Sequence, residues 1–197
     1  MLGKFFQKPE ADQSERVPPG QYLTKGFPVL TYGDTPKIST AEWRLKVWGL
    51  ATPKTYTWDE MMSLPISEFH LDFHCVTRWS RLDMDWTGIK VTDFLKTIEL
   101  DPKATHVMQH SYGGYTTNLT LDEFARDDNF FGLKVSDEPL TAEHGGPMRI
   151  VVPHLYAWKS AKWINGLEFL DHEELGFWER NGYHRRGDPW SEERYSD

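Results

Sequence analysis

A single cysteine, Cys75, is the residue of this 197-residue chain with the most distinctive chemistry. It stands within Phe69–Ser80, where an apolar run meets polar and cationic side chains. A lone thiol cannot form a disulfide within one chain. It can serve as a buried apolar filler, as a nucleophile, or as one soft thiolate ligand to a metal whose other ligands come from elsewhere. The rest of the sequence favours the metal ligand.

Two competing uses of the cysteine and the histidines are weaker on geometry. His74 adjoins Cys75, which leaves a Cys-His-Asp hydrolase as an alternative, but adjacent strand residues point to opposite faces, so His74 is a poor base for its neighbour. The histidines at 70 and 74, and those at 106 and 110, are each four residues apart. On strands this interval separates them by about 13 Å. We therefore favour a metal carried by a cofactor over a zinc ion.

A second segment, residues 143–163, contains the components of an anion-binding site. The Gly-Gly-Pro run at 145–147 allows a close backbone approach, and Arg149 offers two parallel donors. Ser160 and Lys162 add a hydroxyl and a point charge. This combination suits a phosphate or a pterin.

An ordinary structural role is open for the same segment. Residues 148–152 have the pattern of a core strand. Arg149 would then form a surface salt bridge, while Lys159 and Lys162 would be solvated. The residues alone leave both interpretations open.

The elements that must position these residues alternate irregularly between strands and short helices. Strands are expected at 43–49, 69–76, 104–110, 147–153 and 162–170. Helices are expected after the capping boxes Thr57–Glu60, ending near Pro65, and Thr120–Glu123, and over residues 90–99. The chain contains no dinucleotide or P-loop glycine signature and no internal repeat. We therefore predict one α+β domain with mixed β-sheets over residues 21–197.

Both ends of the chain are expected to lack regular structure. Residues 1–20 are charged and proline-bearing, which predicts an extended arm over the domain. Residues 178–197 show no period, but their aromatic side chains indicate that this tail packs onto the domain.

Composition excludes some functions. The net charge of −8 disfavours nucleic acid and acidic membrane surfaces as partners, although a local basic pocket is compatible with it. No apolar run is long enough to span a membrane, and the first residues lack a signal core, so a cytoplasmic location is expected. Nine tryptophans favour a wide, rigid core or the walls of a pocket.

Three motifs together resemble a known family. They read His-Cys-Val-Thr-Arg-Trp-Ser at 74–80, Trp-Thr-Gly at 86–88, and His-Gly-Gly-Pro-Met-Arg at 144–149, which continues to Lys-Ser-Ala-Lys-Trp at 159–163. In this order they resemble the molybdopterin-binding domain of the sulfite oxidase family. The likeness runs from about Phe27 to Trp190 and implies the mixed α+β fold of that family.

The resemblance also implies a role for each matching residue. Cys75 matches the cysteine that ligates molybdenum beside the two dithiolene sulfurs of molybdopterin. Tyr183 matches an active-site tyrosine whose phenol can hydrogen-bond to an oxygen at the metal. The remaining matches are contacts to the cofactor: His144 and Arg149 for the pterin and its phosphate, Ser160, Ala161 and Lys162 for the phosphate side, and Leu30, Thr31 and Ser111 for the pterin.

Departures from the family pattern bear on the substrate and the electron path. Residues 22–26 lack an arginine that sulfite oxidase uses near its oxyanion, and its second domain does not fit in this length, so sulfite is not the expected substrate. Arg78 is expected to face the substrate cavity, with a surface bridge to Asp83 or Asp85 as the alternative. We expect Trp79 and Trp158 to wall the pocket. No haem domain or iron–sulfur cysteine set is present, which implies a separate electron carrier.

The expected function is oxygen-atom transfer on a small S-oxide, N-oxide or oxyanion, with molybdenum and plain molybdopterin as cofactors. Two alternatives belong to other classes. One is a carrier that binds molybdopterin without catalysis, and the other is a metal-free Cys-dependent hydrolase.

Overall fold

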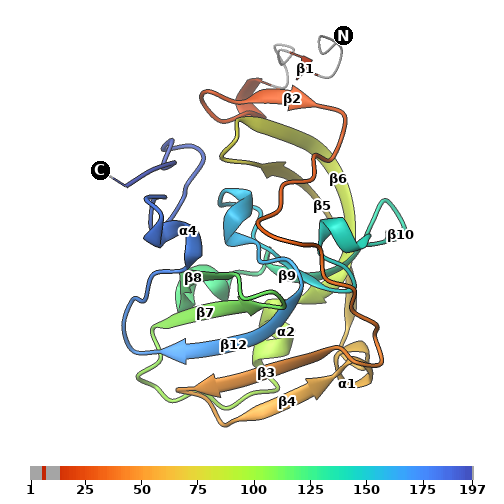
Figure 1. Ribbon diagram of the computed structural model, residues 1–197, viewed down its shortest axis with the longest axis vertical. Coiled ribbons are helices and arrows are strands. Elements are labelled where there is room, and N and C mark those ends of the chain that lie inside the picture. The colour runs from red at the N-terminus through yellow and green to blue at the C-terminus, as the bar shows by residue number, and fades with distance from the viewer. Residues whose placement is uncertain (1–5, 8–13, 197) are drawn as a thin grey trace.

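The computed structural model describes residues 6–7 and 14–196, and two β-sheets dominate it (Figure 1). The α+β class and the mixed character of the sheets are confirmed. In each sheet one strand pair is parallel and the other pairs are antiparallel. No helix within the described ranges has the length and apolar character needed to cross a membrane.

The larger sheet positions Cys75. Within the described residues its seven strands are β1 (Phe6–Gln7), β2 (Tyr22–Thr24), β5 (Ile66–His74), β6 (Trp79–Lys90), β9 (Phe130–Val135), β10 (Glu138–Pro139) and β11 (Arg149–Val151). They follow the order β1-β2-β6-β9-β10, and β5 also pairs with β6 while β11 pairs with β9. β5 and β6 form a long antiparallel hairpin. Cys75 is the first residue of the turn that joins them.

The smaller sheet lies at the other end of the molecule (Figure 1). Its strands in the described part of the chain are β3 (Arg44–Gly49), β4 (Lys54–Thr57), β7 (His106–Ser111), β8 (Thr116–Thr120) and β12 (Ile164–Leu170). Their order is β4-β3-β12-β7-β8, and β3 runs parallel to β12. The strands expected at 43–49, 104–110 and 162–170 are therefore present within two residues of the expected limits.

Helices are short and serve as connections. The α-helices of the described residues are α1 (Trp58–Met62), α2 (Val91–Leu95), α3 (Leu121–Phe124) and α4 (Phe177–Arg180). The capping box before α1 is complete, because Glu60 N–H donates to Thr57 Oγ1 at 3.3 Å and Thr57 N–H donates to Glu60 Oε2 at 2.8 Å. The helix expected over 90–99 ends at Leu95, where Thr97 Oγ1 donates to Phe94 O and closes the turn.

The second capping box is only half formed, which corrects the prediction. Thr120 Oγ1 accepts from Glu123 N–H at 3.2 Å, as an N-cap should. The carboxylate of Glu123 does not turn back to the cap. It accepts from His154 Nε2 at 2.5 Å and from Arg186 Nε at 2.8 Å instead, because an imidazole N–H and a guanidinium compete with the backbone N–H for it.

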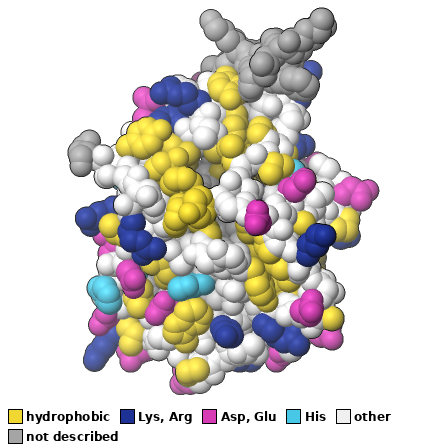
Figure 2. Space-filling view, viewed as in Figure 1, with side chains coloured by type: hydrophobic (Ala, Val, Ile, Leu, Met, Phe, Trp, Pro, Cys, Tyr) yellow, Lys and Arg dark blue, Asp and Glu magenta, His cyan; other side chains and the backbone are white. Residues whose placement is uncertain are grey.

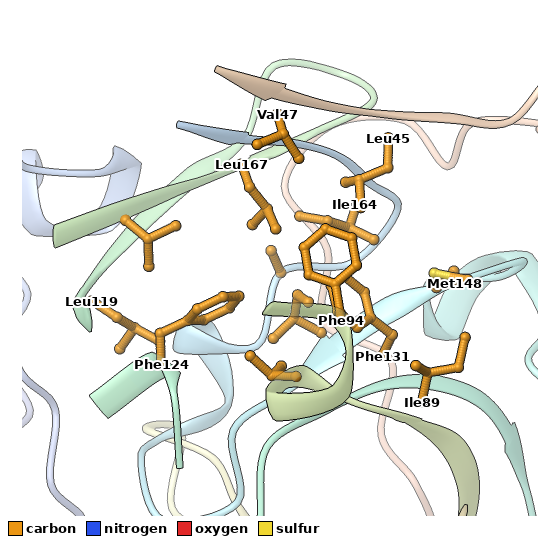
Figure 3. Close-up of a cluster of buried hydrophobic side chains, with 14 of the residues drawn as sticks. Leu45, Val47, Ile89, Phe94, Leu119, Phe124, Phe131, Met148, Ile164 and Leu167 are labelled. Carbon is orange, nitrogen blue, oxygen red and sulfur yellow. The ribbon is translucent and has the colours of Figure 1, made fainter. Parts of the chain in front are cut away.

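The main core fills the space between the two sheets (Figure 3). Side chains from both sheets and from the short helices point toward one another there: Leu45, Val47, Ile89, Phe94, Leu119, Phe124, Phe131, Met148, Ile164 and Leu167. Burying each such side chain stabilises the fold by about 1.5–3 kcal/mol. This core holds the two sheets in a fixed relation, which the site requires because both contribute to its surroundings.

The chain ends were expected to be an arm and a packed tail. Residues 1–5 and 8–13 of the arm lie outside the described residues. Phe6–Gln7 pairs with β2, residues 14–16 form a 3₁₀ turn, and Arg16 binds Asp72. The boundary at residue 20 stays a prediction. The tail packs onto the domain as expected, although it begins within helix α4.

Candidate active site

A cavity of about 320 Å³ opens beside Cys75. Its walls come from five parts of the chain: residues 27–32, the β5–β6 turn, Tyr115, residues 144–163, and the start of the tail. On the molecular surface in Figure 2, hydrophobic side chains gather over the upper half of the face shown, and charged side chains are more frequent below and at the margins. The cavity therefore brings together residues as far apart in the sequence as Phe27 and Tyr183.

Cys75 is held by the backbone of its turn. Its N–H donates to Trp79 O at 2.9 Å, and its carbonyl accepts from Arg78 N–H at 2.9 Å and from Gln21 Nε2 at 3.1 Å. The side chain is 6 % exposed and its sulfur accepts a hydrogen bond from Thr77 Oγ1 at 3.2 Å. Burial raises the pKa of the thiol, while the Thr77 hydroxyl and the more distant cations Arg194 and Lys162 oppose that rise. Cys75 is among the residues that line the cavity, as a residue that binds a ligand there must be.

Arg149 and Lys162 supply positive charge to the cavity without an acidic partner. The guanidinium of Arg149, only 3 % exposed, donates to His144 O at 3.0 Å and to Ser160 O at 2.9 Å. The ammonium of Lys162 donates to Leu30 O at 2.8 Å, to Thr31 Oγ1 at 2.9 Å and to Glu143 O at 2.7 Å. Among the described residues, no aspartate or glutamate side chain lines the cavity.

Burial lowers the pKa of both cations, to about 10 for Arg149 and to about 7 for Lys162, where the charge of Arg149 adds to the effect. An anion in the cavity would reverse these shifts, because it stabilises the protonated forms. The site is therefore electrostatically prepared for an anionic group.

The shifted pKa of Lys162 gives a pH-dependent expectation. In solvent its pKa is 10.5, so only the folded protein loses this charge as the pH rises through about 7. An anion binds the protonated form, hence its affinity should be highest below pH 7 and fall above it. Sulfate keeps its own charge over this range. In cofactor-free protein, sulfate should raise Tm more at about pH 6 than at about pH 8.5.

Lys162→Met is the matched variant for that measurement, and it should remove most of the difference between the two pH values. Burial lowers the pKa of the neighbouring His144 from 6.5, so this ring is less protonated than a free imidazole over the same pH range. Equal stabilisation by sulfate at both pH values in the wild-type protein would contradict the assigned shift.

The ring of His144 is fixed beside the two cations. It stacks on Phe27 with ring centroids 4.2 Å apart, and its Nε2 lies 3.0 Å from Phe27 O. Only an N–H can donate to that carbonyl, so Nε2 carries the proton. The next residue, Gly145, has φ +104°, and a Cβ there would lie 3.0 Å from Lys162 Cβ and 3.1 Å from Arg149 Cβ. Glycine is required because it brings the three functional side chains close together.

Aromatic rings form another part of the cavity wall. Tyr183 stacks on Trp178 at 4.8 Å and meets Trp158 edge-on at 5.0 Å. Trp158 Nε1 donates to Glu179 Oε1 at 3.1 Å, which fixes the indole from behind. Trp79 also lines the cavity, and its buried Nε1 has no hydrogen-bond partner among the described residues. The expected walls, Trp79 and Trp158, are therefore in place.

Eight of the residues inferred from the resemblance line this one cavity. They are Cys75, Tyr183, Leu30, Thr31, His144, Arg149, Ser160 and Lys162. Arg149 and Lys159 are buried, so the alternative of a surface salt bridge and a solvated lysine is wrong for these two residues. The individual roles of the eight residues stay predictions.

Three other inferred residues do not line the cavity. Arg78 is exposed in the tight turn after Cys75, where its φ is +75°, and it is not among the lining residues, which does not support the expectation that it faces the substrate cavity. Among the described residues it forms no ion pair with Asp83, which Arg16 and His70 bind, or with Asp85, which His70 binds. Ser111 and Ala161 are buried beside the lining residues.

Sequence reasoning missed several lining residues. Thr77 was inside the quoted motif, two residues after the cysteine, and a hydroxyl at that spacing is a signal for a bond to sulfur. Phe27 and Tyr115 gave no such signal. Tyr115 reaches the site by donating to Trp158 O at 2.6 Å, and that contact depends on the tertiary fold.

The two-sheet α+β domain, with a buried thiol and two cations around one cavity, has the features expected of a redox protein that binds an anionic metal cofactor. Residues 32–178 match the family model of the oxidoreductase molybdopterin binding domain, and the chain belongs to this family. The resemblance inferred from the motifs is thereby confirmed, and the chain is an oxidoreductase of the sulfite oxidase-like type.

Individual relatives span different shares of the chain. It is 44% identical over 194 residues to the uncharacterized oxidoreductase YuiH of Bacillus subtilis (strain 168), with 98% of each chain covered. It is 31% identical over 157 residues to the protein-methionine-sulfoxide reductase catalytic subunit MsrP of Gluconobacter oxydans, covering 70% of this chain and 50% of MsrP. The crystal structure of the sulfane dehydrogenase SoxCD from Paracoccus pantotrophus has the same fold, with a TM-score of 0.68 at 16% identity over 90% of this chain and 53% of that one.

Proposed function

We propose that the chain binds a molybdenum–molybdopterin cofactor in this cavity, with Cys75 as the protein ligand to the metal, and catalyses oxygen-atom transfer on a small substrate. One observation carries the proposal. A buried thiol and two cations line the same cavity, and no carboxylate of the described residues lines it, in a chain of net charge −8. A soft metal and an anionic phosphate are the groups that such a lining attracts.

The residues fit this cofactor chemically. Cys75 offers a thiolate as a soft ligand for the metal. Arg149, Lys162 and the ring of His144 suit a phosphate and a polar heterocycle. The buried Nε1 of Trp79 lacks a partner among the described residues and is available to a bound acceptor. The volume of about 320 Å³ lies at the lower end of the range for small-molecule and cofactor sites.

When bound, the molybdenum centre supplies the two-electron redox chemistry that moves an oxygen atom to or from a substrate. The protein does the rest. Thr77 donates to the Cys75 sulfur and so moderates the basicity of a thiolate there. Burial raises the pKa of Tyr183, which keeps its phenol protonated and able to donate to a substrate oxygen. The rings of Trp158 and Trp178 exclude water from that end of the cavity.

The substrate class is an S-oxide, an N-oxide or an oxyanion. The name of the Gluconobacter oxydans relative, a protein-methionine-sulfoxide reductase catalytic subunit, makes S-oxides the first class to test. A separate electron carrier is required, because the chain has one cysteine and no iron–sulfur ligand set. A cytoplasmic location stays a prediction.

Arg149→Ala tests the anchoring part of the proposal. Hydrogen bonds to charged groups contribute about 1.5–3 kcal/mol each, so losing this guanidinium should weaken cofactor binding on the order of 10- to 100-fold. Molybdenum per chain and the fluorescence of the oxidised pterin measure the occupancy. Arg126→Ala, on an exposed arginine, is the matched control and should leave occupancy as in the wild type.

Arg149→Lys separates folding from anchoring, since it keeps the charge but cannot reach both carbonyls. It should give an intermediate occupancy. Full occupancy in both Arg149 variants would remove Arg149 from the proposed anchor.

The hydrolase alternative has no support in the geometry. His74 Nδ1 lies 2.8 Å from Ser80 Oγ, and burial lowers the pKa of His74 to about 4, which makes it a weak base. Burial also raises the pKa of Cys75, the opposite of an activated nucleophile. A carrier without catalysis differs from the proposed enzyme in one measurement, because only the enzyme reduces S- or N-oxides with a dye as electron donor.

A further inference from the structure

Arg194, in the C-terminal tail, lies behind the turn that carries Cys75. Its side chain is buried, with 6 % exposed, and comes from beyond residue 178, where the family match ends. Nη1 donates to Val76 O at 2.7 Å, and Nη2 donates to Pro19 O at 3.3 Å. One guanidinium therefore joins the residue after Cys75 to Pro19, and these two contacts are 118 and 175 residues from Arg194 in the sequence. In Figure 1 the tail lies close to the end of the β5–β6 hairpin.

The guanidinium of Arg194 is buried without a close carboxylate to balance its charge. The nearest carboxylate oxygen, Glu192 Oε1, is 3.9 Å from Nη2, and that glutamate is half exposed. Among the described residues the buried Nε has no hydrogen-bond partner. Its remaining support is the ring of Tyr156, whose centroid is 4.9 Å from Cζ. A buried charge without a close counter-ion is destabilising, so this guanidinium depends on the backbone carbonyls that it holds, one of which belongs to the turn after Cys75.

The backbone of Arg194 is locked to the wall of the cavity. Tyr183 and Tyr195 form an antiparallel bridge, and His184 N–H donates to Arg194 O at 3.2 Å. Ser196 N–H donates to Gly182 O at 3.0 Å on the other side of the bridge. Residues 182–196 thus form a small hairpin in which Tyr183 lies opposite Tyr195, the residue that follows Arg194.

The same hairpin packs tightly against Tyr156 and Trp158. Gly187 O accepts from Tyr156 N–H at 2.8 Å. Gly187 has φ +82°, and a Cβ there would lie 2.6 Å from the ring of Trp158. The hairpin is therefore built to contact the cavity wall closely, and a displacement of it would be felt at both Tyr183 and Trp158.

We propose that Arg194 is a positioning residue for Cys75, and that the hairpin 182–196 is part of the active site. By holding the Val76 carbonyl, Arg194 fixes the Val76–Thr77 peptide in the turn that carries Cys75, and so directs the sulfur into the cavity. Through the hairpin, the same residue fixes the relation between the sulfur and Tyr183. The inference deepens the proposed function, since it assumes that the direction of this sulfur matters for metal binding.

Three variants test the inference. Arg194→Ala removes the guanidinium, and Arg194→Lys keeps a charge but cannot reach Val76 O and Pro19 O together. Arg185→Ala is the control, because this arginine of the same hairpin is exposed and its side chain binds only Glu173. In protein made without molybdate, Cys75 is the sole thiol, so its rate of alkylation by N-ethylmaleimide reports directly on the turn. In protein loaded with molybdenum, X-ray absorption at the metal counts its sulfur ligands.

We expect alkylation of Cys75 to be about 10- to 100-fold faster in Arg194→Ala, with a smaller rise in Arg194→Lys and the wild-type rate in Arg185→Ala. The rise must exceed what the measured loss of global stability accounts for. In loaded Arg194→Ala we expect fewer sulfur ligands, or a longer metal–sulfur distance, and a fall in kcat with little change in KM.

Wild-type alkylation rates in the folded Arg194 variants would overturn the inference, and so would a rise no larger than global unfolding explains. If Arg194→Ala does not fold, Arg194→Lys decides by the same measurements. If the wild-type protein binds no molybdenum, the proposed function fails, but the alkylation rates still decide whether Arg194 positions Cys75.

Discussion

Cys75→Ser will abolish turnover and leave most of the pterin bound. The hydroxyl of serine is a hard, weakly acidic donor and cannot replace a soft thiolate on the metal. The pterin should stay, because Arg149 and Lys162 are untouched and hold its anionic side. Even residues that only support a metal ligand contribute about 10- to 100-fold, so loss of the ligand itself should reduce kcat by at least that factor. Dye-linked reduction of a sulfoxide, expressed per bound pterin, measures the effect.

The comparison with Arg149→Ala makes this result specific. That variant should lose activity mainly in proportion to its lost cofactor, whereas Cys75→Ser should lose activity per bound cofactor. Loss of anchoring then appears as lower cofactor occupancy, and loss of the metal ligand appears as lower activity per bound cofactor. A Cys75→Ser protein with wild-type activity per bound pterin would contradict the assignment of Cys75 to the metal.

Glu179→Ala is expected to have the largest effect on stability. Lys159 is 0 % exposed, and its Nζ lies 2.6 Å from Glu179 Oε1. The same carboxylate oxygen accepts from Thr117 Oγ1 at 2.9 Å and from Trp158 Nε1 at 3.1 Å. Removing Glu179 leaves the ammonium buried without its counter-ion, which costs about 3–5 kcal/mol. For a chain of this length Tm should fall by about 6–20 °C.

Unfolding in urea, followed by tryptophan fluorescence, measures this loss. Lys96→Ala is the matched control, because Lys96 forms its ion pair with Asp93 on the surface, and we expect unfolding as in the wild type. Replacing both partners, with Lys159→Met and Glu179→Leu, should recover part of the stability, since no unpaired charge then remains. A loss below about 1 kcal/mol in Glu179→Ala would show that Lys159 finds sufficient support in its other acceptors.

Short-range patterns predicted much of the fold. The alternation in residues 43–49 and the capping box at Thr57 act locally, and both appear where they were expected. Strand β6 was missed because Arg81, Asp83 and Asp85 interrupt its apolar pattern. Arg81 and Asp85 pair with β5 in the neighbouring arm of the hairpin, while residues 86–90 of the same strand pair with the distant β9, which a local pattern does not contain.

The site was predictable where motif and position coincide. Cys75 and Lys162 line the cavity, but Arg78, three residues from the cysteine, does not, because a left-handed turn separates the two side chains. Lys159 was expected in solvent, and its burial depends on Glu179, which follows twenty residues later in the tail. Arg194 gave no local signal either, since its contacts are 118 and 175 residues away.

Lys159 and Lys162 differ in whether a carboxylate balances the charge of the ammonium group. The charge of Lys159 is balanced by the carboxylate of Glu179, so this ion pair contributes little to the electrostatic potential at a distance. Lys162 and Arg149 donate instead to neutral carbonyl and hydroxyl oxygens, which replace water but supply no counter-charge. The interior of the cavity thus projects a positive potential toward its opening while the molecule as a whole is acidic. Anionic molecules that diffuse past the protein are repelled by most of its surface and drawn inward at this one mouth.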